Sequence, residues 1–207
     1  MMSTRSATRS DVVEVAATRD ELPLWRVAGA ELAAEQGRMV HLVDDLLLLA
    51  RLDGHVPVAQ DEVDLDDVVH DAVTTLRQHG SVAVSVTPLP ALRVRGDGGQ
   101  LARIVRNLLD NAERHARSRL DVSLTSEGGW AVVRVSDDGP GVPPADRERV
   151  FERFTRLDEA RARDRGGSGL GLAISRESAR AHGGSLELRD SPSGGAQLEL
   201  RLPLWRG

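Results

Sequence analysis

Two periods organise the apolar and polar positions of this chain, one near 3.6 residues and one of two residues. The first is typical of amphipathic helices and the second of half-buried strands. The longer period predicts helices over residues 21–53, 65–79, 99–116 and 170–182. The alternation predicts strands over residues 82–86, 92–96, 120–125, 130–137, 185–189 and 196–203. These elements predict an α+β fold: a two-layer α/β sandwich with a mostly antiparallel sheet, preceded by a long amphipathic helix.

The first predicted helix places its apolar residues on a heptad, which is typical of a helix that pairs with another helix. One seam row holds Leu32, Met39 and Leu46, and the other holds Leu42 and Leu49. His41 follows Met39 by two residues and is therefore expected on the outward side of the helix. Gly54 and Pro57 end the helical pattern.

Composition and pattern divide the chain into three parts. We expect residues 1–20 to be disordered because they are polar and terminal. Residues 21–54 form the heptad helix, and residues 55–205 form the compact domain. Within that domain we expect residues 55–64 to be a linker and residues 139–168 to be a loop with a short helix near Phe151.

The composition excludes several classes of function. All 27 basic residues are arginine and there is no cysteine, which rules out P-loop lysine chemistry, Schiff bases, thiolate nucleophiles and cysteine-bound metals. A net charge of −5 with 2% aromatic residues argues against nucleic-acid binding. No stretch approaches about 18 apolar residues and no secretory signal is present, so we expect a cytoplasmic chain without a membrane segment.

Amide and imidazole side chains recur every four residues along the third predicted helix, as Asn107, Asn111 and His115. Such residues share one helix face. The face is either a solvated polar stripe or a site where amide oxygens bind a hard cation such as Mg²⁺ and the histidine meets phosphate.

Asp137 ends the strand over residues 130–137, in the row of Val133 and Val135, where an apolar residue is expected. A buried carboxylate accepts hydrogen bonds only, which would suit an amino group such as that of adenine. Gly139 and Gly141 then allow a tight turn. The alternative is an ordinary Asp-Gly turn after a strand.

Glycines cluster directly before the fourth predicted helix, at residues 166, 167, 169 and 171. Free N–H groups at a helix N-terminus favour phosphate, and nearby arginines could close over it. The spacing is not that of a dinucleotide-binding Rossmann motif. The alternative is a solvated loop.

The order of these motifs resembles the N, G1, F and G2 boxes of the two-component histidine kinases. These kinases belong to the Bergerat-type (GHKL) ATPases, together with Hsp90, MutL and type II topoisomerases. The resemblance extends over residues 38–203, and "RMVHLVDDLLLLARLDG" looks like the second helix of the dimerisation and phosphotransfer domain of that family.

The resemblance implies a role for each motif residue. Asn111 would coordinate the Mg²⁺ that bridges the ATP phosphates, and Asp137 would accept from the adenine amino group. Phe151 and Phe154 would anchor a lid over ATP. The ATP-binding residues implied in full are Asn107, Asn111, His115, Asp137, Gly139, Gly141, Phe154, Arg161, Gly167, Gly169, Leu170 and Gly171.

Two departures from the family pattern affect these expectations. Ala196 stands where many members have a threonine near the adenine pocket. The phosphoacceptor motif H-E-x-x-x-P is absent from the sequence, as is the first dimerisation helix that would carry it. His41 is not expected to replace that histidine, because Leu42 follows it rather than an acidic residue.

The resemblance therefore implies an ATP- and Mg²⁺-dependent histidine kinase that phosphorylates a histidine of another chain. Its partners would be a response regulator receiver domain and either a histidine-bearing dimerisation domain or a second copy bound through residues 21–53. Two alternatives stay open, a non-catalytic ATP-binding or dimerising regulator and an anti-sigma-type serine kinase.

Overall fold

The computed structural model describes residues 36, 39, 42–52, 54, 57–155 and 168–205. The chain divides into two units, residues 1–44 and residues 45–207. In the first unit the described residues 36, 39 and 42–44 are helical, and His41 lies outside the described residues. None of the helices in the described part of the chain is long and apolar enough to cross a membrane.

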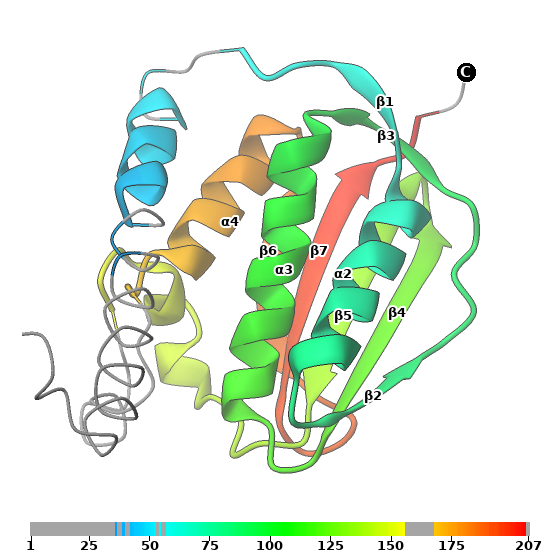
Figure 1. Cartoon of the computed structure of the whole chain (residues 1–207), viewed down its shortest axis with the longest axis vertical. Coiled ribbons are helices and arrows are strands. Elements are labelled where there is room, and N and C mark those ends of the chain that lie inside the picture. Colours follow the sequence, from blue (N-terminus) through cyan, green and yellow to red (C-terminus); the bar gives the residue numbers. More distant parts are fainter. Residues whose placement is uncertain are drawn as a thin grey trace, which may run out of the picture. The chain divides into compact units, whose positions relative to one another are not determined.

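A five-stranded sheet forms one layer of the second unit (Figure 1). Its strands, in spatial order, are β2 (Ala83–Val86), β4 (Arg119–Glu127), β5 (Trp130–Asp137), β7 (Ala196–Pro203) and β6 (Ser185–Asp190). Only β2 and β4 run parallel, and the other neighbours are antiparallel. Gly128 and Gly129 form the β4–β5 turn with φ values of 57° and 90°, which is the left-handed conformation that a two-residue hairpin requires.

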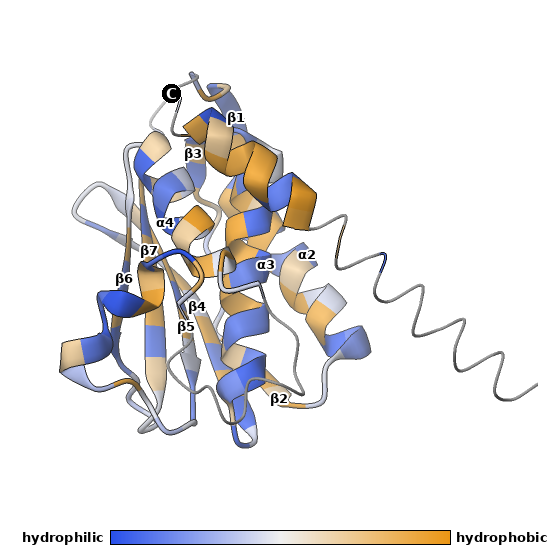
Figure 2. Ribbon diagram, turned by 90° about the vertical axis from the view of Figure 1, so that its left-hand side faces the viewer, coloured by the Kyte–Doolittle hydropathy of each residue, from blue (hydrophilic) through white to orange (hydrophobic). Residues whose placement is uncertain are grey.

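Three helices cover one face of this sheet: α2 (Leu65–His79), α3 (Gly98–His115) and α4 (Gly171–Ala181). The central helix α3 packs against both of the others. Figure 2 views the layers from the side, with the strands on one side and α2 and α3 on the other. This arrangement confirms the predicted two-layer α/β sandwich.

The core lies between the layers. Helix α3 contributes its predicted apolar face, which is buried in full: Leu101, Ile104, Val105, Leu108, Leu109 and Ala112. The opposing sheet residues include Val133, Val135, Leu198 and Leu200, all at most 2% exposed. Each fully buried leucine contributes about 1.5–3 kcal/mol, so this face positions α3 firmly over the sheet.

The predicted linker over residues 55–64 is wrong at its end. Asp61–Asp64 forms strand β1, which pairs antiparallel with β3 (Arg93–Gly96) in a separate two-stranded sheet. Arg93 bonds Glu62 and Asp64 at 2.5 and 2.7 Å. The acidic residues obscured this strand in the sequence, because their partner charge comes from a strand some 30 residues later.

The loop predicted over residues 139–168 contains two short 3₁₀ helices in its described part, η1 (Pro144–Asp146) and η2 (Arg149–Phe151). Helix η2 agrees with the short helix predicted near Phe151. The other predicted helices and strands of residues 65–203 agree with the structure to within two residues at their ends.

Candidate functional site

Asp137 is the buried end of strand β5, with an exposed fraction of 3%. It shares a face with Val133 and Val135, as the alternation predicts, and both valines are also buried. Its Oδ1 accepts hydrogen bonds from the backbone N–H of Gly139 at 2.8 Å and of Ala196 at 3.2 Å. The carboxylate is therefore held by two turns, one following β5 and one preceding β7.

Two glycines pack directly against this carboxylate. A Cβ on Gly139 would lie 2.4 Å from the carbonyl oxygen of His115 and 2.7 Å from Asp137 Oδ1. A Cβ on Gly195 would lie 2.3 Å from the same Oδ1. All three distances are well below van der Waals contact, so only glycine allows these backbones to approach Asp137. Gly141 has a φ of 72° and lies beside Gly195. Gly195 was not among the predicted site residues, because its role depends on Asp137, at the end of a strand about 60 residues earlier in the chain.

The adjacent Asp138 has a different role, which the sequence did not reveal. Its carboxylate accepts from the Ser118 hydroxyl at 2.6 Å and from the backbone N–H groups of Arg117, Ser118 and Arg119. The hydroxyl bond and these N–H bonds hold the pKa of Asp138 well below its ordinary value. Asp138 thus ties the connection between α3 and β4 to the end of β5, beside Asp137.

The polar stripe of α3 runs from this end of the site toward α4. Asp97 begins the helix by accepting from the Gln100 backbone N–H at 3.0 Å. Asn107 is half-buried, and its Nδ2 donates to the Gly171 carbonyl at 3.2 Å and to Ser175 Oγ at 3.1 Å. Asn111 is half-buried and His115 is exposed. The stripe therefore links the surroundings of Asp137 to the glycine segment before α4.

That glycine segment lies at the N-terminus of α4. Leu170 is fully buried at the N-cap position, and no side chain caps the helix there. Gly169 has a φ of 70°, and its carbonyl accepts from the backbone N–H of Phe154 at 3.1 Å. The uncapped N–H groups of α4 and the positive end of its dipole would favour an anion. Arg161 and Gly167, two of the predicted site residues, lie outside the described residues.

The two phenylalanines of the "FERF" motif differ in their surroundings. Phe151 is buried at 8% exposed, with the Arg176 guanidinium 4.8 Å from its ring centre, and Arg176 also bonds Glu148 at 2.8 Å. Phe154 is 64% exposed and has a φ of 63°, which is rare outside glycine. Phe151 is therefore the buried residue of this motif. The Phe154 ring is largely exposed, and its backbone N–H is bonded to the Gly169 carbonyl.

Comparison with known proteins agrees with this geometry. The family model for "Histidine kinase-, DNA gyrase B-, and HSP90-like ATPase" matches residues 96–206. Among curated relatives, the sensor-like histidine kinase SenX3 of Mycolicibacterium smegmatis is 35% identical over 193 residues, covering 90% of this chain and 50% of the relative. The probable sensor histidine kinase TcrY of Mycobacterium tuberculosis is 39% identical, covering 86% and 38%. This chain spans half the length of these relatives or less.

Solved structures give the same result. The mycobacterial sensor histidine kinase MprB matches with a TM-score of 0.60 and 33% identity, covering 72% of this chain and all of the other. The ATP-binding domain of PrrB from Mycobacterium tuberculosis matches with a TM-score of 0.59 and 32% identity, covering 71% and 98%. The chain therefore belongs to the histidine kinase-, DNA gyrase B- and HSP90-like ATPase family, and it is homologous to sensor histidine kinases.

Proposed function

We propose that this chain is the ATP-binding catalytic part of a two-component sensor histidine kinase. It transfers the γ-phosphate of ATP to a histidine of another chain, for relay to an aspartate of a response regulator receiver domain. The observation that carries the proposal is the buried Asp137, held at the end of β5 and linked along α3 to the glycine segment before α4. Within residues 55–205, the proposed catalytic domain, these are the two ends of a nucleotide site.

Asp137 is the residue that selects the base. The N–H groups of Gly139 and Ala196 donate to Oδ1, so Oδ2 is the oxygen to which the adenine amino group would donate. An ionised carboxylate only accepts, and it would repel the keto oxygen that guanine carries at the same position. Gly139 and Gly141 shape the base pocket because neither backbone carries a side chain there.

The phosphates would lie between α3 and the N-terminus of α4, near Asn107, Asn111 and His115. Gly167, Gly169, Leu170 and Gly171 supply backbone N–H groups, and Arg161 adds positive charge, with Phe154 at the edge of the lid. Because the chain has no lysine, its neutralising groups are arginines, the α4 dipole and a metal ion.

The residues of this site fit a Mg²⁺ ion that would bind together with the triphosphate of ATP. Among the described residues, no three His, Asp or Glu side chains are grouped so that they could hold a metal ion. Asn111 supplies a single amide oxygen, and Mg²⁺ commonly takes one or two protein ligands together with phosphate oxygens and water. In the transfer, the bond between the γ-phosphorus and the β–γ bridging oxygen breaks, ADP leaves, and a phosphorus–nitrogen bond forms with the acceptor imidazole.

Residues 21–54 would form the dimerisation stem, either with a second copy or with a histidine-bearing dimerisation domain. Leu46 of the first seam row is 47% exposed and is available to such a partner. Leu49 of the second row is 4% exposed and packs against Leu170 and Ile174 of its own domain. The predicted seam is therefore divided between two partners, one outside the domain and one within it.

The test is phosphorylation in trans. The 207-residue chain is incubated with labelled Mg·ATP, alone and with a dimerisation domain from a sensor histidine kinase that carries the H-E-x-x-x-P motif. We expect acid-labile label on the added domain and none on this chain. We expect the Asn111→Ala variant of this chain to leave the added domain unlabelled. Nucleotide binding without any transfer would favour the non-catalytic regulator, and acid-stable label on a serine substrate would favour the serine kinase. Label on this chain that disappears with His41→Ala would show that His41 is the acceptor.

A further inference from the structure

An acidic residue at the start of the helical segment over residues 45–52 lies beside the proposed phosphate site. Asp45 forms an ion pair with Arg103 of α3, and its second oxygen accepts from Ser168 Oγ at 3.3 Å. The Asp45 side chain is only 13% exposed and that of Arg103 is 24% exposed. All three residues belong to the unit of residues 45–207. The pair is therefore partly shielded from water, where charge interactions are strongest.

An apolar contact one helical turn later holds the same helix face. Leu49 packs against Leu170 and Ile174, which are fully buried at the start of α4. Leu46 and Leu47 lie on another face and are about half exposed. The helix thus docks onto its own domain through residues 45 and 49, with an ion pair at one position and a leucine at the other.

The contacts of Asp45 and Leu49 lie next to the part of the proposed site that would hold the phosphates. Arg103 precedes Asn107 by four residues, so it extends the stripe of Asn107 and Asn111 by one turn. Ser168 lies within the glycine segment, directly before Gly169, and its Oγ accepts from the Leu170 backbone N–H at 3.3 Å. The first turn of α4 carries no acidic residue. The negative charge of Asp45 therefore lies where the Arg103 guanidinium and the N-terminus of α4 both favour an anion.

We propose that Asp45 is an internal anion that competes with the terminal phosphates of the nucleotide for Arg103 and Ser168. The inference rests on the proposed function and adds a regulation of the same site. A carboxylate and a phosphate that both approach Arg103 would repel each other, and only one of them can pair fully with its guanidinium. Docking of the helix and binding of a nucleotide with a terminal phosphate therefore oppose each other. By linkage, each weakens the other by the same factor.

Nucleotide affinity tests the competition. Calorimetry compares the full chain with Asp45→Asn, which keeps the shape and removes the charge, and with Asp44→Asn, the same change at the neighbouring exposed residue. The ligands are Mg²⁺ with AMP-PNP, which has three phosphate-type groups, and AMP, which has one. We expect Asp45→Asn to bind AMP-PNP about five- to tenfold more tightly. Its AMP affinity should match that of the parent, as should both affinities of Asp44→Asn.

Hydrogen exchange tests the reverse effect on the helix. Saturating Mg·AMP-PNP should accelerate amide exchange in residues 45–52 of the parent chain, and AMP should not. In Asp45→Asn, AMP-PNP should no longer change this exchange, because the competing charge has been removed. Ion pairing that served only stability would leave the exchange unchanged or slower on nucleotide binding, and that result overturns the proposal.

The outcomes separate this inference from the proposed function. A parent chain that binds no Mg·AMP-PNP overturns both. A parent chain that binds it through Asn111, with Asp45→Asn indistinguishable from Asp44→Asn, overturns the competition alone. Equal losses of AMP-PNP and AMP affinity in Asp45→Asn would show that Asp45 only maintains structure, which also overturns it.

Discussion

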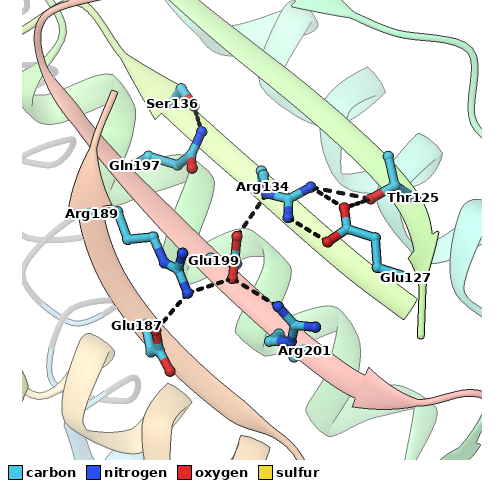
Figure 3. A network of polar contacts seen from close by, with 9 residues as sticks. All are labelled: Thr125, Glu127, Arg134, Ser136, Glu187, Arg189, Gln197, Glu199 and Arg201. Carbon is cyan, nitrogen blue, oxygen red and sulfur yellow. Dashed lines mark hydrogen bonds and ion pairs between the residues drawn. The ribbon is translucent and has the colours of Figure 1, made fainter. Parts of the chain in front are cut away.

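Arg134 of β5 and Glu199 of β7 face each other across adjacent strands, with Arg134 Nε 2.7 Å from Glu199 Oε2 (Figure 3). Glu199 is 2% exposed although it alternates with Leu198 and Leu200, so it lies on the sheet face away from the helices. Arg189 and Arg201 contact its other oxygen at 3.2 and 3.3 Å. Three guanidinium groups therefore cover one carboxylate on the sheet face opposite α2, α3 and α4.

Glu199→Gln should destabilise the domain, because it leaves three arginines without their shared acceptor charge. We expect the free energy of unfolding to fall by about 2 kcal/mol, as is typical for loss of a charged hydrogen bond. Urea denaturation measures the loss. The control is Glu187→Gln, since Glu187 is 53% exposed and bonds Arg189 alone in this network. Equal effects of the two substitutions would contradict a central role for Glu199.

Acid should weaken the same network through Glu127. Hydrogen bonds from Arg134 and then from Thr125 lower the pKa of Glu127 from 4.5 to about 2. The carboxylate of Glu127 therefore binds a proton more tightly in the unfolded chain than in the folded one. Its contribution to the free energy of unfolding is complete above about pH 4.5 and is lost as the pH falls toward 2. Urea denaturation across this range should show a shallower pH dependence for Glu127→Gln than for the parent. An equal pH dependence of stability in Glu127→Gln and the parent chain would contradict the assignment of this effect to Glu127.

Asp137→Asn should weaken adenine recognition without unfolding the domain. The amide keeps an oxygen for the turn but replaces a charged acceptor, which costs about 1.5–3 kcal/mol or roughly ten- to a hundredfold in ATP affinity. The preference for ATP over GTP should narrow at the same time. Titration with fluorescent ATP analogues measures both effects, with Asp71→Asn on the exposed side of α2 as the control. Unchanged ATP affinity in Asp137→Asn would remove Asp137 from the site.

Gly139→Ala should be costly and Gly98→Ala should not. The new Cβ at residue 139 would meet the His115 carbonyl at 2.4 Å, so backbone must move, at about 1–3 kcal/mol. At residue 98 the nearest atom is 3.8 Å away, and alanine in the first turn of α3 should be neutral or stabilising by up to about 1 kcal/mol. Thermal melting compares the two. Similar melting temperatures would show that the turn after β5 adapts easily.

The two phenylalanines of "FERF" should respond in opposite ways. Phe151→Ala removes a buried ring and should lower the free energy of unfolding by about 3 kcal/mol. Phe154→Ala removes a largely exposed ring, and its effect should stay within about 0.5 kcal/mol. Chemical denaturation without nucleotide checks both values. A large loss in Phe154→Ala would show that its ring is buried in solution.

Local pattern was sufficient where one face of an element meets the core. The apolar stripe of α3 and the row that ends in Asp137 were both predicted, because burial imposes a period that the sequence displays directly. The pattern failed at β1, whose acidic residues are stabilised by Arg93 of β3. It also missed Asp138 and Gly195, whose roles come from backbone groups distant in the sequence.

By itself, the sequence determined the two-layer fold and the family, and it supplied the motif residues of the proposed nucleotide site, since each is encoded by local periodicity or by short spacing. The tertiary structure decided which partner each residue meets. Leu49 fits a dimer seam and a contact with α4 equally well in the sequence, and it packs against Leu170. Asp45 resembles any exposed helix residue until the fold brings Arg103 and Ser168 to it. Periodicity specifies which face of a helix is buried, and only the fold specifies against what.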